Sequence, residues 1–463
     1  MRSTGRFSRR SLLGWGGVVG GGVLLAACGA APAAMEGEGE MEAKEEAPKA
    51  EQADTKEMEP RLLVHTDWWR PGGAPTIQEY FDGIKGDFME LNPGVTVESV
   101  HVRGTLGLQD QVTTMIAAGE QVDSSQVSVA FILNWLLKDF LQPLDPFQAK
   151  DPDSAPDKFV DSGRFFNVHN GMTYGIPYDG PATVVMGLNT RILTDAGLDT
   201  DREVTWNWEW DQFVEYATKV HEAEGDNITR LGYGTSGFSL SGIARWLYPN
   251  GATLYTDDNK AAAFDSAQGI DTGQFKEDLK LQHKFGPTPE GATFVNEQIV
   301  LSQQGSWAVG YIYGNNENLE FDFAPFPKGP SGENPGSMTW TNQWCLFSVS
   351  PDPELAWSWI SWVNSEATLE KYFAGILSRS AGRKEFYQSE PWQKIVAERP
   401  MLKDIEAIAD TSGPYPWLHT SAGNEATKPV WDALNNQELT VQEAFPQAAV
   451  LLNGVLEELG TPG

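Results

Sequence analysis

One stretch, Tyr174 to Leu198, constrains the fold of this chain more than any other. The backbone is expected to change direction at its start, which contains four turn-forming residues: Gly175, Pro177, Gly180 and Pro181. The apolar run from Thr183 to Leu188 contains two valines and predicts a buried strand. A short helix over 191–196 then ends at Gly197, a residue typical of the position after a helix. A kinked segment that enters a buried strand can carry a chain from one lobe to another.

The same stretch resembles the extracellular solute-binding proteins of ABC importers, the maltose-binding-like family. Members commonly read Tyr-Gly-(Ile/Leu/Val)-Pro-Tyr, then a strand ending in Tyr-Asn, then Ala-Gly-Leu. This chain matches at 175–178, Asn189 and 196–198, and departs at 186–188, where the usual aromatic residue is absent. The resemblance implies an α/β fold of two lobes, the type II periplasmic-binding-protein fold. Each lobe would be a mostly parallel sheet flanked by helices.

The first 28 residues have the pattern of an export signal. The segment from Ser8 to Leu13 contains paired arginines and resembles the twin-arginine signal, and the apolar run 12–27 is shorter than the ~20 residues that span a bilayer. The run ends in Leu25-Ala26-Ala27-Cys28, which resembles a bacterial lipobox. The alternative is a transmembrane anchor with an incidental cysteine. We expect Cys28 to carry a diacylglycerol, making the protein an extracytoplasmic, membrane-anchored lipoprotein.

Residues 29–60 are rich in Ala, Glu, Lys, Met and Pro, which predicts a disordered acidic tether. About 400 residues follow, enough for two lobes. By analogy with the family, the first lobe would comprise 61–172 and 317–362, and the second 173–316 and 363–463. Crossings between lobes are expected near 174–179, 310–314 and 361–365.

The charge and the cysteines narrow the class of protein. The chain has 33 basic and 64 acidic residues, a net charge of −31, which argues against nucleic acid as a partner. Cys28 and Cys345 are its two cysteines. If Cys28 is lipidated, no disulfide framework exists, and Cys345, within an apolar run, is expected to be a small buried hydrophobe.

Two βαβ units are predicted at the start of the globular part. Strand signals at 62–64 and 95–102 flank a helix whose apolar residues recur at helical spacing from Ile77 to Phe88. A second helix is predicted near 106–118 and a strand near 126–131. Two such units predict a parallel sheet.

Later segments match the family in order. The tryptophans of 206–210 precede a helix, which resembles the family's Thr-Trp-Asp-Glu helix start. Gly305-Ser306-Trp307 resembles the family's Gly-(Ser/Pro)-Trp strand, expected after a helix over 296–304. Residues 340–349 are predicted to be the next strand, with Trp344 entering the cleft. A helix over 353–363 resembles the family's Pro-Glu-Ala-Ala-Trp segment.

The sequence contains no catalytic or metal-binding motif. Its six histidines show neither His-x-x-His nor His-Glu-x-x-His spacing, and it has no Gly-x-Ser-x-Gly elbow. We therefore expect no enzyme activity, no metal and no cofactor. An exported glycosidase stays open as the rival, because the many carboxylates could include two facing one glycosidic bond, roughly 5–10 Å apart.

The 17 Trp, 12 Tyr and 22 Phe suit a ligand with sugar rings, whose apolar faces stack on aromatics and whose hydroxyls need polar partners. For any single tryptophan, packing in the core explains the sequence as well as a place in the ligand site does. Arg379 would bond hydroxyls or an acid group of the ligand, or form a surface ion pair; Ser378 and Ser380 depart from the family's pattern around it. The candidate ligand-binding residues are Trp68, Trp69, Tyr178, Asp179, Trp246, Trp307, Trp340, Trp344, Arg379 and Trp417.

Together these features predict a monomeric solute-binding protein that closes on a sugar or oligosaccharide through a hinge. It would deliver that ligand to the permease subunits of an ABC importer. A ligand that is not a carbohydrate is the alternative within the class: a glycerophosphodiester, a polyamine, phosphate or a peptide.

Overall fold

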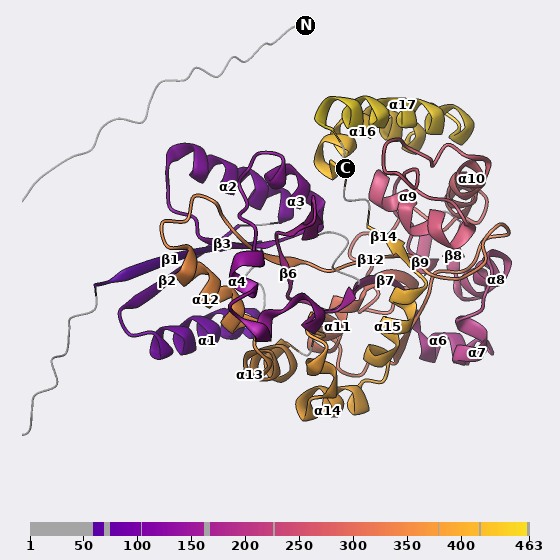
Figure 1. Ribbon diagram of the computed structural model, residues 1–463. Coiled ribbons are helices and arrows are strands. Elements are labelled where there is room, and N and C mark those ends of the chain that lie inside the picture. The colour runs from indigo at the N-terminus through magenta and orange to yellow at the C-terminus, as the bar shows by residue number, and fades with distance from the viewer. Residues whose placement is uncertain are drawn as a thin grey trace, which may run out of the picture. The chain divides into compact units, whose positions relative to one another are not determined.

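The computed structural model describes residues 59–68, 75–102, 104–161, 167–225, 227–377, 379–415 and 418–460 (Figure 1). In these ranges the chain forms two α/β lobes, each built around its own sheet, as predicted. The sheets are not mostly parallel as expected but mixed, because strands that return from distant parts of the sequence pair antiparallel with their neighbours. Over the same ranges no helix combines the length and apolarity that crossing a membrane requires. The predicted signal, Cys28 and nearly all of the predicted tether lie outside the described residues.

The first sheet has the strand order β2-β1-β3-β13-β6. Strand β1 (Arg61–Asp67) pairs in parallel with β2 (Val95–His101) and with β3 (Ser124–Val127). Helices α1 (Pro75–Leu91) and α2 (Thr105–Ala118) connect these strands, which confirms the two βαβ units. The predicted third strand is shorter than expected, since β3 ends at Val127 and helix α3 (Val129–Leu136) follows directly.

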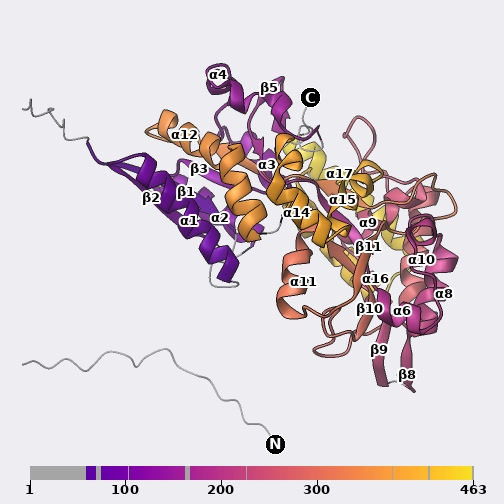
Figure 2. The same ribbon diagram turned by 90° about the horizontal axis from the view of Figure 1, so that it is seen from below.

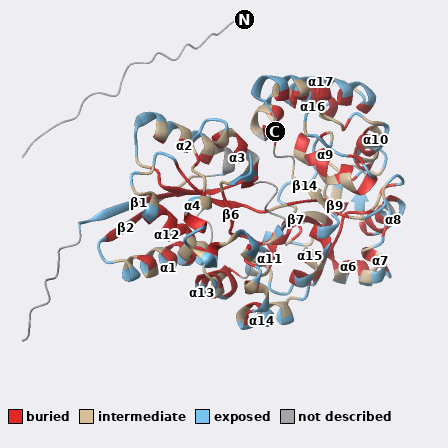
Figure 3. Ribbon diagram, in the orientation of Figure 1, coloured by how far each residue is buried: buried red, intermediate tan, exposed pale blue. Residues whose placement is uncertain are grey.

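Antiparallel strands complete the first sheet from distant parts of the sequence. Strand β13 (Gln343–Leu346) lies between β3 and β6 (Ile176–Pro177) and pairs with both. Neighbouring residues of β1 point to opposite faces, as in any strand. Leu63 packs with α1 and α12 (Pro353–Val363), whereas Val64 packs with α2 and α3. Both faces of this sheet are therefore covered by helices (Figure 3).

The second sheet has the order β14-β12-β7-β10-β9-β8, with β11 also paired to β7. Its centre is β7 (Ala182–Asn189), the strand predicted from the apolar run, and all eight residues of β7 are buried. Strands β8 and β9 form the edge far from the first sheet in both views (Figures 1 and 2). The remaining strands are β8 (Glu222–Glu224), β9 (Asn227–Tyr233), β10 (Ile299–Gly305), β11 (Phe321–Ala324), β12 (Met338–Trp340) and β14 (Gly413–Pro414).

Helices pack on and around the second sheet. The face of β7 formed by Val184, Met186 and Leu188 packs in one core cluster with residues of α8 and α9. These helices and the others of this lobe are α6 (Thr190–Asp195), α7 (Arg202–Thr205), α8 (Trp210–Val220), α9 (Leu240–Leu247), α10 (Ala267–Leu281), α11 (Val309–Asn315), α15 (Met401–Asp410), α16 (Thr420–Asn435) and α17 (Val441–Leu459).

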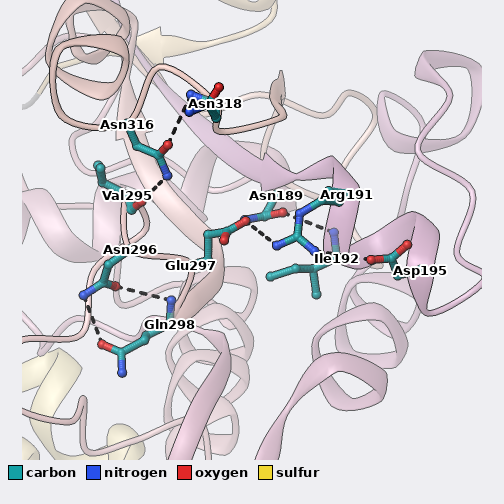
Figure 4. A network of polar contacts seen from close by, with 10 residues as sticks. All are labelled: Asn189, Arg191, Ile192, Asp195, Val295, Asn296, Glu297, Gln298, Asn316 and Asn318. Atoms are coloured by element: carbon teal, nitrogen blue, oxygen red, sulfur yellow. Dashed lines mark hydrogen bonds and ion pairs between the residues drawn. The ribbon is translucent and has the colours of Figure 1, made fainter.

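A polar network fixes the end of β7 (Figure 4). Asn189 caps α6, because its Oδ1 accepts a hydrogen bond from the backbone N–H of Ile192 at 3.2 Å. Its amide donates to Glu297, which also forms an ion pair with Arg191. Asn189, which matches the family motif, thus has a structural role as a helix cap.

Residues 299–305 are a strand, where a helix over 296–304 was expected. The β-branched and apolar start of β10, Ile299 to Leu301, is buried, and the strand pairs antiparallel with β7 and parallel with β9. Ser306 to Ala308 then form a single tight turn that leads into α11. Trp307 therefore stands just beyond the end of a strand.

The division into lobes differs from the predicted boundaries. Strands β11 and β12 pair with β7, so 321–340 belongs to the second sheet and not to the first lobe. Conversely, the π-helical segment Glu370–Leu377 packs against α1 of the first lobe, and Tyr372 and Phe373 contact the ring of Tyr80. Family analogy placed these boundaries, and the strand pairing corrects them.

The crossings follow from this pairing. The first, from β6 to β7, agrees with the predicted one near 174–179. The second runs from β12 to β13, because the predicted crossing at 310–314 lies within α11. The predicted crossing at 361–365 lies at the end of α12, on the first lobe. A third passage instead joins α14 (Glu390–Glu398) to α15, which packs on β7 and β11.

Candidate functional site

A pocket of about 420 Å³ opens where β7, β10 and β12 of the second sheet meet α9. We refer to it as the β10 pocket. Its walls are Val184, Ser241, Arg245, Gln303, Gln304, Gly305, Trp307, Ala308, Met338, Trp340 and Tyr415. Two of the ten predicted ligand residues, Trp307 and Trp340, are among them.

Three aromatic rings form one wall of the β10 pocket. The Trp307 and Trp340 ring centroids are 5.3 Å apart, and Trp340 lies 4.9 Å from Tyr415. Trp307 is 41% exposed, which is unusual for a tryptophan and leaves its ring available to a ligand. Gly305 permits this placement, because a Cβ at that position would lie 2.2 Å from the Trp307 ring.

Polar side chains line the opposite part of the β10 pocket. The Nη1 of Arg245 donates to the Oε1 of Gln303 at 2.6 Å, and Gln303 in turn donates to the hydroxyls of Tyr233 and Ser236. Burial lowers the pKa of the Arg245 guanidinium. Ser241 and Arg245 are one turn apart on α9, so both reach the same pocket. The pocket combines apolar ring faces with hydrogen-bond donors.

The β10 pocket lies at the junction of the two lobes. Tyr415 packs against the core clusters of the second lobe and also against the first-lobe cluster that contains Val64. The lobes meet again at α3, where the Oδ1 of Asn134 is 3.2 Å from the Nδ1 of His419. A ligand in the β10 pocket would therefore lie beside both lobes.

Three predicted site residues lie in the core and do not line the β10 pocket. Trp344 is 1% exposed, because β13 is an inner strand covered by helices, and its ring contacts His65 and Trp359. Trp246 is fully buried among Phe213, Phe275 and Phe326. Tyr178 is 1% exposed and packs on Trp344. The expectation that Trp344 enters the cleft is thus corrected.

Asp179 connects two of the crossings between the lobes. Its carboxylate, 2% exposed, accepts hydrogen bonds from the backbone N–H of Asn342 at 2.7 Å and from the Asn342 side chain at 2.6 Å. Burial raises the pKa of Asp179 to about 6, while Arg379, 3.7 Å away, and Asn342 oppose this rise. Asp179 follows β6 and Asn342 precedes β13, so this contact, the hinge clamp, ties the two crossings together.

The remaining predicted ligand residues are Trp68, Arg379, Trp69 and Trp417. Trp68, half-buried at the end of β1, lies 6.4 Å from the Tyr178 ring. The Arg379 side chain is 21% exposed and pairs with the buried Asp179, whereas the ion pair expected as its alternative role was one at the surface. Trp69 and Trp417 lie outside the described residues, so their predicted role is untested.

Sequence reasoning missed Arg245, Gln303 and Tyr415. A signal was present for the first, because Ser241 and Arg245 are polar residues one turn apart in an otherwise apolar helix. Gln303 and Gln304 are adjacent polar residues that follow the apolar start of β10. Cys345 is buried as predicted, and burial raises the pKa of its thiol.

The described residues hold no group of three or more His, Cys, Asp or Glu side chains placed to bind a metal ion. The walls of the β10 pocket, as far as the structure describes them, include neither Asp nor Glu. Glycoside hydrolysis generally uses two carboxyl groups across the scissile bond. The chemistry that this pocket offers is therefore stacking and hydrogen bonding.

Comparison with known proteins identifies the class. The family model for bacterial extracellular solute-binding proteins matches residues 71–370, well over half of the chain. The chain therefore belongs to this family, whose members are extracytoplasmic binding proteins.

Individual relatives have low sequence identity to this chain. A putative binding protein of Brucella abortus (strain 2308) is 25% identical over 291 residues, which is 60% of this chain and 66%, just under two thirds, of the relative. The fold is similar to that of the ABC substrate-binding protein Lmo0181 of Listeria monocytogenes, solved in complex with cycloalternan (TM-score 0.73, 16% identity). It is equally similar to a solute-binding protein of Thermotoga lettingae TMO bound with α-D-tagatose (TM-score 0.73, 20% identity). Each alignment covers 86% of this chain and the whole of the solved chain.

Proposed function

We propose that this protein captures a saccharide between its lobes and delivers it to the permease of an ABC importer. The β10 pocket carries this proposal, because it sets three aromatic rings against amide and guanidinium donors at the lobe junction. A sugar ring needs that pairing of apolar faces with polar partners. The similar proteins solved with cycloalternan and tagatose support the same ligand class.

Binding would close the lobes around the hinge clamp. Capture between lobes by a hinge is a common way to bury a ligand, and the residues that move lie in short connections such as those between β6 and β7 and between β12 and β13. The absence of Asp and Glu from the described walls of the β10 pocket supports transport and disfavours an exported glycosidase.

Lipidation of Cys28 and extension of residues 29–60 as a tether complete the proposal. They would hold a monomeric binding protein near its permease, and they rest on the sequence pattern alone.

Thermal unfolding in the presence of a saccharide panel tests the proposal. A ligand at ~100 times its dissociation constant adds about 2.7 kcal/mol to the free energy of unfolding, and a bound oligosaccharide should be recovered uncleaved. The proposal fails if no saccharide raises the melting temperature, or if the oligosaccharide is hydrolysed by the purified protein.

A further inference from the structure

Arg245 is a half-buried charge without an acidic partner. Among the described residues, no carboxylate lies within 4.0 Å of its guanidinium, and the Nε has no hydrogen-bond partner. The acidic groups that act on it electrostatically are the phenols of Tyr233 and Tyr415, which are neutral at pH 7. A charge removed from water and left unpaired lowers the stability of a fold, so its retention in a pocket needs a reason.

A second basic residue, Lys276, lies close enough to Arg245 for their charges to interact. Lys276 is 5% exposed, its Nζ donates to the backbone carbonyl of Ser236, and it lies 4.8 Å from the centre of the Phe238 ring. It, too, forms no ion pair with a carboxylate in the described part of the chain. Burial and the positive charges of Arg245 and Lys280 lower the pKa of Lys276 to about 7. Ser236 also connects this lysine to Gln303 and so to Arg245.

The polar side chains of the β10 pocket favour a ligand that accepts hydrogen bonds. Its polar side chains are a guanidinium, two amides and the hydroxyls of Ser241 and Tyr415, and the described walls contain no carboxylate. The amide donors of Gln303 and Gln304 already bond to other side chains, so the guanidinium of Arg245 is the cationic donor group of the described walls. Carboxylates are the strongest acceptors for the hydroxyls of a neutral ligand, and a guanidinium is the strongest partner for an anion. In a chain with 64 acidic and 33 basic residues, this local excess of positive charge opposes the overall balance.

We propose that the saccharide bound by this protein is acidic, with a carboxylate or a phosphate ester that pairs with Arg245 while its ring lies against Trp307 and Trp340. This inference rests on the proposed function and narrows its ligand class. The anion would give the Arg245 guanidinium the acidic partner that the described residues do not supply, and it would offset the positive charge of the second-lobe interior. A uronate and a sugar phosphate share this chemistry, so the test includes both.

The test compares charged ligands with their neutral counterparts by calorimetry. The probes are trigalacturonate and its fully methyl-esterified form, and glucose 1-phosphate and glucose. We expect at least one acidic member to bind about tenfold or more tightly than its neutral counterpart, the range for a hydrogen-bonded charge pair. In the Arg245→Gln variant, the affinity for the acid should fall about tenfold more than that for the neutral form.

Two control variants distinguish loss of the Arg245 charge from loss of the folded structure as the cause of weaker binding. Arg245→Lys keeps the charge and should retain part of the preference for the acid, whereas Arg61→Gln removes a surface arginine paired with Asp352 and should change nothing. Melting temperatures verify that each variant is folded. The inference is overturned if neutral saccharides bind as tightly as acidic ones, or if Arg245→Gln weakens both equally; the proposed function then stands. If no saccharide of either kind binds, the proposed function fails with it.

Discussion

Replacing Asn342 by alanine should destabilise the protein in a way that depends on pH. The substitution removes the 2.6 Å hydrogen bond to the buried Asp179 carboxylate and leaves the 2.7 Å backbone bond in place. A hydrogen bond to a charged group contributes about 1.5–3 kcal/mol, against about 1 kcal/mol for a neutral pair. The loss should therefore be larger when Asp179 is ionised.

The sign of the pH effect follows from the raised pKa. Asp179 has a pKa of about 6 in the folded protein against an ordinary value of 3.8, so its contribution to stability is greatest below pH 4 and is lost as the pH rises through 6. Asn342 holds this pKa down. Without its side chain, the pKa of Asp179 rises further, and the loss of stability extends to higher pH.

Calorimetric melting at pH 5 and pH 8 measures the effect. For a domain of about 400 residues, the entropy of unfolding is ~0.8 kcal/mol per degree, so a loss of ~2 kcal/mol lowers the melting temperature by ~2–3 °C. We expect a drop of about this size at pH 8 and of about half this size at pH 5. Asn318→Ala, at an exposed position, is the control. Equal drops at both pH values would refute the assignment of Asp179 as a titrating hinge clamp.

Three further outcomes are expected. Trp307→Ala should weaken saccharide binding about 5- to 30-fold by calorimetry, while Tyr311→Ala, at a 62% exposed position one turn further along, should leave it within about twofold; equal losses would contradict the stacking role. Cys345 should resist a maleimide in the native protein and react once urea unfolds it, because its thiol is buried with a raised pKa; fast native labelling would show that β13 opens. Cys28→Ser should release the protein from membranes or leave the precursor uncleaved, as judged by fractionation and intact mass; membrane retention of a cleaved variant would exclude lipid as the anchor.

The parts of the fold that follow local rules were predictable. Strand and helix periods over 61–118 predicted the two βαβ units, and the apolar run at 183–188 predicted β7. The helix expected over 296–304 by family analogy is wrong, because the β-branched start of β10, Ile299 and Val300, favours the strand that the structure shows. The crossing at 310–314 failed for a related reason, since Gly310 and Gly314 are helical residues of α11 rather than a bend.

The site was harder to predict because tertiary pairing decides which aromatic rings are reachable. Trp307 and Trp344 have similar sequence surroundings, yet one follows a strand end and the other lies on an inner strand covered by helices. The spacing of Ser241 and Arg245 is a local signal, but the absence of a carboxylate near Arg245 is seen only in three dimensions. Local sequence specifies elements, whereas exposure and charge pairing depend on contacts between distant residues.

The position of β13 in the first sheet has a consequence for synthesis of the chain. During translation β1, β2 and β3 emerge early, but the strand that covers the edge of β3 arrives only with Gln343 to Leu346, after most of the second lobe. Until then β3 presents an unpaired edge that invites pairing with other nascent chains. A product terminated before residue 343 should aggregate however well its helices form, and a split of this protein into complementing halves should place the break after Leu346.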